Sequence, residues 1–195
     1  MRKITFLWFF HLCWNDDKKW TLLTTIFIPL VPIAIICEIH RFLNSRTISH
    51  LSLVMCLALT AWINEIILKP ALAIPPLDDS CFAGCYAPST FVALGFAALT
   101  VYLLRFAFSG PREILGAICW GVFAILEFVA HPFSNYLSWT NDAISIVPGV
   151  VIGVFWASLV EFKFFSVFLY ELCQKFKIEN DINREGYQRE DLIAS

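Results

Sequence analysis

The sequence predicts an all-α membrane protein, a polytopic bundle of about five transmembrane helices. Its 195 residues are 58% hydrophobic and only 15% charged, and its mean hydropathy is +0.70. Soluble globular domains hold about 45–50% apolar and about 25% charged residues, so this composition excludes that class of protein. Low charge with high hydropathy also excludes a disordered chain. The formal net charge of −2 supplies no basic field, so nucleic acid is excluded as a partner.

Stretches with few or no charges place the five predicted spans. A spanning helix needs roughly 20 mostly apolar residues. Such spans fit at residues 20–39, 48–68, 88–108, 114–132 and 143–169. The first contains Pro29 and Pro32, which a spanning helix tolerates where neighbouring helices satisfy the freed backbone groups. We therefore expect the membrane bundle to cover residues 20–172.

The two ends of the chain differ from this bundle in composition. Within residues 1–19, the apolar stretch 4–14 is too short to cross a bilayer, and a polar run, residues 15–19, follows it in place of a small-residue cleavage site. We expect an aromatic segment at the membrane interface. Residues 173–195 are polar and mixed in charge, which predicts a cytosolic tail. Tryptophans near the predicted span ends indicate interfacial belts; they are Trp8, Trp14, Trp20, Trp139 and Trp156.

The distribution of positive residues predicts the orientation. Five spans put the two termini on opposite sides, with five Lys and Arg residues on the N-terminal side and nine on the C-terminal side. The positive-inside rule then places the C-terminus in the cytosol. The connections 69–87 and 133–142 face the lumen, and we expect a multi-pass protein of the endoplasmic reticulum.

Cys81 and Cys85 share the first lumenal connection. An oxidising lumen would permit a disulfide between them, and two free thiols are the alternative. Their spacing lacks the second ligand pair of a zinc site. The chain has no Walker loop, nucleophile elbow or dinucleotide fingerprint. We expect neither a metal nor a cofactor.

Three segments that flank the lumenal connections carry a family resemblance. The second span ends at Lys69, the third opens with Pro88 and Ser89, and the last follows Ser134. Over residues 48–160 this layout resembles the type 2 phosphatidic acid phosphatase (lipid phosphate phosphatase) superfamily, and within it the dolichyl diphosphatases. The family carries the motifs K-x6-R-P, P-S-x-H and S-R-x5-H-x3-D.

The resemblance implies phosphate chemistry at the lumenal surface. In the resembling enzymes the third-motif His attacks phosphorus, the adjacent Asp orients it, and the second-motif His protonates the leaving oxygen. Lys and Arg residues hold the phosphate oxygens. By the same resemblance, the phosphate-binding positions in this chain are Lys69, Ser89 and Ser134.

The catalytic positions of the three motifs are degenerate. Neutral residues replace the two arginines, the two histidines and the aspartate; they are Pro76, Phe91, Asn135, Asn141 and Ser145. Phenylalanine cannot donate a proton, and an asparagine amide is no useful nucleophile. The resemblance therefore implies an inactive relative, a lipid-binding or scaffold subunit. Its expected partners are membrane lipids, including a polyprenyl or phosphorylated lipid, and another membrane protein.

Two other readings stay open. A divergent phosphatase would hydrolyse dolichyl diphosphate or another lipid phosphate with residues outside the motifs, and an unrelated five-span protein would share the layout by chance. The weak catalytic candidates are His131, three residues before Ser134, and Glu127, one helical turn earlier. An ionisable residue inside an apolar span is a functional hypothesis. The alternative is an i,i+4 pair that anchors a helix end.

We expect cysteines introduced at positions 80 and 185 to be labelled from opposite sides of the membrane. The charge asymmetry places these positions in a lumenal connection and in the cytosolic tail. Labelling sealed vesicles with an impermeant maleimide, before and after permeabilisation, measures this. Labelling of both positions from the same side would refute the predicted topology.

Overall fold

Helices make up most of the chain from residue 30 onward. The computed structural model describes residues 2–7, 10–14, 27–74, 87–133, 137–161 and 175. The helices are α2 (Leu30–Ser45), α3 (Ile48–Trp62), the π-helical turn η1 (Ile63–Leu68), α4 (Lys69–Leu72), α5 (Thr90–Ser109), the 3₁₀ turn η2 (Pro111–Glu113), α6 (Ile114–Phe133) and α7 (Trp139–Glu161). The bundle is therefore all-α, as predicted.

Within the described residues, four helices have the length and composition of a membrane span. They cover Ile48–Leu72, in which α3, η1 and α4 are continuous, Thr90–Phe108, Ile114–Phe133 and Trp139–Val160. These correspond to the last four predicted spans and support a multi-pass membrane protein. The first predicted span, residues 20–39, is described only from residue 27, where α2 has 16 residues. The fifth crossing stays a prediction.

The N-terminal segment adds a hairpin that the sequence analysis did not predict. β1 (Arg2–Leu7) and β2 (Phe10–Trp14) pair in antiparallel register, with Lys3 opposite Cys13. The segment is rich in aromatic and β-branched residues, which favour strands. Periodicity in so short a stretch does not separate a strand from an interfacial helix.

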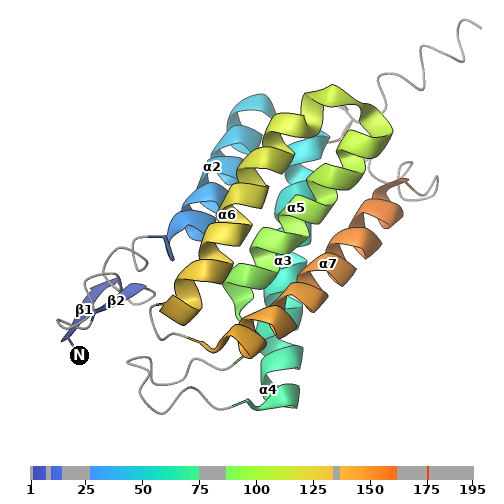
Figure 1. The fold of residues 1–195 in the computed structure, drawn as a ribbon. Coiled ribbons are helices and arrows are strands. Elements are labelled where there is room, and N and C mark those ends of the chain that lie inside the picture. The colour runs from blue at the N-terminus through green and yellow to red at the C-terminus, as the bar shows by residue number, and fades with distance from the viewer. Residues whose placement is uncertain are drawn as a thin grey trace, which may run out of the picture.

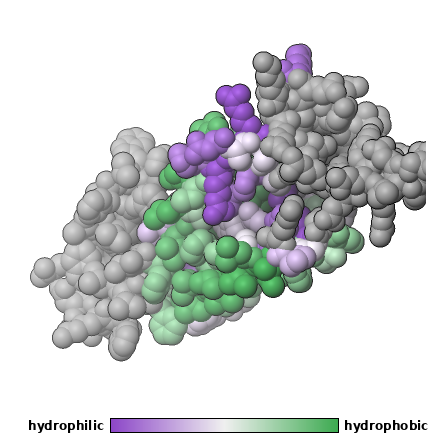
Figure 2. Space-filling model, turned by 90° about the horizontal axis from the view of Figure 1, so that it is seen from above, coloured by the Kyte–Doolittle hydropathy of each residue, from purple (hydrophilic) through white to green (hydrophobic). Residues whose placement is uncertain are grey.

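Successive helices alternate in direction, so the bundle has two distinct ends (Figure 1). One end carries the α2–α3 and α5–α6 connections together with Arg41, Arg46 and Arg105; we call it the cationic end. The opposite end carries α4, the start of α5 and the start of α7, with Lys69, Ser89 and Asn141; we call it the motif end. Figure 2 looks onto the cationic end and shows hydrophilic residues gathered there beside a hydrophobic flank.

The backbones of α5 and α7 lie in close contact, because glycines of α7 have no side chain to separate them. A Cβ atom on Gly149 would overlap the carbonyl oxygen of Ala93, and one on Gly153 would lie 2.9 Å from the carbonyl oxygen of Ala97. Small residues four apart on facing helices are the usual basis of such contact in membranes, where packing replaces hydrophobic association between helices. Ala93 and Ala97 are fully buried, so this seam forms the centre of the bundle.

Trp156 joins this core, and the prediction of an interfacial role for it was wrong. Its side chain is 7% exposed, and its indole Nε1 donates to Ser52 Oγ at 3.0 Å, which links α7 to α3. A buried indole N–H needs an acceptor, and Ser52 supplies one inside the bundle. Trp139 is instead half exposed and contacts the Phe128 and Phe133 rings edge to face.

We expect Gly149→Ala to destabilise the bundle and Gly121→Ala to leave it unchanged or slightly stabilised. Overpacking costs about 1–3 kcal/mol, and the Gly149 methyl group would meet the α5 backbone. A methyl group on Gly121 would make ordinary contact with Leu99 at 3.4 Å, while helix propensity favours Ala over Gly by about 1 kcal/mol. Thermal unfolding of both variants in detergent measures the difference. Equal midpoints would contradict a backbone contact at Gly149.

Candidate functional site

The second and third motif positions are in direct contact at the motif end. The backbone N–H of Ser89 donates to Ser145 Oγ at 2.6 Å, and Ser145 Oγ donates to the carbonyl oxygen of Asn141 at 2.9 Å. Both serine side chains are buried. Ser89 is also the N-cap of α5, because its Oγ accepts from the Val92 N–H at 3.4 Å. The N-cap residue of α5 therefore donates its own backbone N–H to Ser145.

Lys69 reaches this end through a wide helical turn. The Lys69 N–H bonds to the carbonyl oxygen of Asn64, five residues earlier, and Pro70 has no N–H with which to continue an α-helical ladder. The Lys69 Nζ lies 2.5 Å from Glu65 Oε1, which also accepts a hydrogen bond from Thr90 Oγ1. The one described lysine at the motif end thus has a carboxylate partner.

Asn64, which was not among the predicted site residues, belongs to the same polar network. Its buried Nδ2 donates to the Pro88 carbonyl oxygen at 3.1 Å and to Thr90 Oγ1 at 2.8 Å. These bonds fasten the end of the second span to the start of α5. An amide near the end of an apolar span is the signal that was available, because buried polar groups need partners.

His131 lies between two carboxyl groups at the α6–α7 junction. Its Nδ1 is 3.0 Å from Asp142 Oδ1, and its Nε2 is 3.2 Å from Glu127 Oε1. None of the three side chains is exposed. The i,i+4 spacing of Glu127 and His131 predicted one of these contacts. Among the described residues, no group of His, Cys, Asp and Glu could hold a metal ion.

Asp142 was missed because the predicted last span began after it, at residue 143. The helix begins four residues earlier, at Trp139, because the Ser138 Oγ accepts from the Asn141 N–H at 3.2 Å. Three of the four residues after Ser138 are polar, Trp-Thr-Asn-Asp, so no apolar run marked this serine as an N-cap. With this start, Asp142 lies in the first turn of α7 and is fully buried. The predicted connection 133–142 is correspondingly shorter.

The buried position of His131 limits its chemistry. A nucleophile must reach the reacting atom, but this side chain is fully buried and a carboxyl group faces each of its ring nitrogens. The cluster links α6 to α7.

The other predicted positions fall into two groups. Phe91 is partly buried and packs against the hydrophobic core, and Asn141 is partly exposed. Five residues lie outside the described part of the chain, so their predicted roles stay predictions: Pro76, Cys81, Cys85, Ser134 and Asn135.

Comparison of the chain with protein families, curated proteins and solved structures found no match. The likeness to lipid phosphate phosphatases therefore rests on motif order alone.

We expect His131→Gln to destabilise the protein strongly and Lys69→Gln to do so weakly. Each residue forms an i,i+4 pair with a glutamate. The His131 pair is fully buried, and the Lys69 pair is partly exposed. Breaking a buried pair costs about 3–5 kcal/mol, whereas a surface pair contributes about 0–1 kcal/mol. Chemical unfolding of the purified variants measures both losses. If His131→Gln lost as little stability as Lys69→Gln, the His131 cluster would not hold the bundle together.

Proposed function

We propose that the protein is a catalytically silent relative of the lipid phosphate phosphatases, acting as a lipid-binding or scaffold subunit in the endoplasmic reticulum membrane. The observation that carries this proposal is the Ser89–Ser145 hydrogen bond. It supports an arrangement in which the second and third motif positions lie together, as the resemblance implies. At those positions the polar groups bind each other, which leaves fewer donors for a phosphate.

The chemistry at the motif end supports a silent site. Lys69 is paired with Glu65, and Phe91 stands where the family has its proton donor. Loss of one preorganised donor from an oxyanion-type site costs about 3 kcal/mol. General acid catalysis typically contributes about 10²–10⁴-fold in rate. Such effects are not additive. Even so, loss of the donor alone or of the general acid alone would lower the rate about a hundredfold or more.

The charge distribution supports the proposed orientation. Arg41, Arg46 and Arg105 lie at the cationic end, opposite Lys69. The positive-inside rule places such an end in the cytosol. The motif end then faces the lumen and the C-terminus the cytosol.

We expect the purified protein in lipid nanodiscs to release no phosphate from dolichyl diphosphate, phosphatidate or sphingosine phosphate. The informative variant is Lys69→Gln, because it removes the predicted phosphate-binding cation with little expected cost to stability. Release by the wild type that falls in this variant would establish the divergent enzyme instead. Restoring the family residues at positions 76, 91, 135, 141 and 145 is the reciprocal test. Activity that appears only then would support a scaffold whose chemistry was lost.

A further inference from the structure

A cavity at the cationic end belongs to none of the motifs. It has a volume of about 470 Å³ and lies among α2, α3, α5 and α6. Its polar part is lined by two carboxylates, two guanidinium groups and three other polar side chains: Glu38, Glu113, Arg41, Arg105, Ser49, His50 and Tyr102. Its apolar part is lined by side chains that include Leu30, Ile33, Leu115 and Phe123. Polar groups at one end and an apolar wall at the other indicate an amphiphilic ligand.

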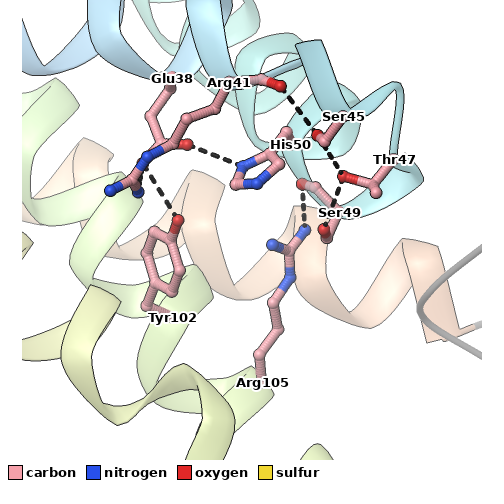
Figure 3. Close-up of polar contacts among 8 residues, drawn as sticks. All are labelled: Glu38, Arg41, Ser45, Thr47, Ser49, His50, Tyr102 and Arg105. Carbon is pink, nitrogen blue, oxygen red and sulfur yellow. Dashed lines mark hydrogen bonds and ion pairs between the residues drawn. The ribbon is translucent and has the colours of Figure 1, made fainter.

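Glu38 is already occupied by groups of the protein itself (Figure 3). Its carboxylate is 2.9 Å from His50 Nδ1, and it accepts from Arg41 Nη1 at 3.3 Å and from Tyr102 OH at 3.2 Å. The side chain is 4% exposed. Gly116 permits this arrangement, because a Cβ atom there would overlap the Tyr102 ring. Glu38 therefore organises the wall of the cavity and offers little attraction to a ligand cation.

Arg105 faces the same cavity with most of its donors available. Its Nη2 donates to the Ser49 carbonyl oxygen at 3.0 Å, and the guanidinium carbon lies 6.0 Å from the centre of the Tyr102 ring. Within the described residues, no carboxylate lies within ion-pair distance of this guanidinium. A guanidinium has five N–H donors, and a long cationic side chain near the end of a span extends toward the headgroup region of the bilayer.

The apolar wall extends from this arginine toward the middle of the bundle. On α6 the lining residues run from 115 to 123, a rise of about 12 Å at 1.5 Å per residue. Ile33 and Leu115, which flank the cavity on α2 and α6, are 51% and 68% exposed. In a spanning bundle such apolar surface faces lipid. A chain of the bilayer can therefore enter between α2 and α6.

We propose that this cavity binds one phospholipid, with its headgroup phosphate at Arg105 and Arg41 and one acyl chain between α2 and α6. Arginine matches phosphate oxygens with paired N–H groups, and Arg41 is 62% exposed at the cavity rim. A free phosphate would leave the apolar wall uncovered, whereas a phospholipid covers both parts. The inference rests on the proposed lipid-binding role but places the lipid at the end opposite the phosphatase-like motifs.

The test uses the full-length protein in detergent with a phosphatidylcholine that carries a photoactivatable diazirine in its acyl chain. Phosphatidylcholine is a phosphodiester, so its binding is independent of any phosphatase activity. We expect cross-links to peptides from α2 and from residues 115–123. Arg105→Gln should lower them about tenfold, the effect of losing about 1.4 kcal/mol of binding. Arg46→Gln, a change at the same end outside the cavity lining, should leave them unchanged.

A second pair of variants keeps the test decisive if Arg105→Gln fails to fold. Cys119→Trp adds bulk at a position that lines the apolar part of the cavity and leaves Arg105 intact, while Ile118→Trp adds the same bulk at the neighbouring position of α6, outside the lining; both positions are exposed. We expect only Cys119→Trp to abolish cross-linking. Equal cross-linking of a diacylglycerol probe, which has no phosphate, or full cross-linking of Cys119→Trp would overturn the inference. Neither result would alter the phosphate-release measurement at the motif end.

Discussion

The close contact between the backbones of α5 and α7 determines how the rest of the bundle is arranged. Ser89, Ala93 and Ala97 follow one another at four-residue intervals on α5, and Ser145, Gly149 and Gly153 do so on α7. Each α5 residue meets its counterpart, first through a hydrogen bond and then through close approach of glycine to carbonyl oxygen. The polar contact at the motif end is therefore the outermost layer of a packing seam. A change in helix register would disrupt all three layers together.

Both ends of the bundle contain carboxylates close to histidine or arginine, but the two arrangements differ in exposure. At the motif end, His131 lies between two carboxyl groups, and all three side chains are fully buried. At the cationic end, Glu38 is surrounded by three donors, and Arg105 faces a cavity that Glu113 also lines. Buried and mutually paired groups hold helices together, whereas a cation with available donors beside a cavity can bind a ligand. Ligand binding is therefore better supported at the cationic end.

Local features of the structure could be predicted from the sequence, and contacts between distant segments could not. Charge-free stretches located the four described spans, and i,i+4 spacing indicated the Glu127–His131 contact. Asp142 was missed because a charge was taken as the limit of a span, although the Ser138 cap extends α7 past it. Arg105 and Ser49 are 56 residues apart. A periodic pattern of hydrophobic residues does not indicate such a contact, because only the packing of α3 against α5 brings the two residues together.

The packing seam also offers an account of the family resemblance that does not require catalysis. The matches at Pro88 and Ser89 lie where α5 starts, and Gly149, four residues after the third motif's last position, lies where α7 meets α5. The serine caps a helix, and the glycine permits backbone contact, so both have structural roles in any bundle of this geometry. Catalytic positions of the motifs differ from the family: Phe91, in place of the proton donor, packs against the core, and Ser145, in place of the aspartate, bonds to a backbone amide. The matched serine and glycine therefore have packing roles in this chain, and activity has to be judged from the positions that differ.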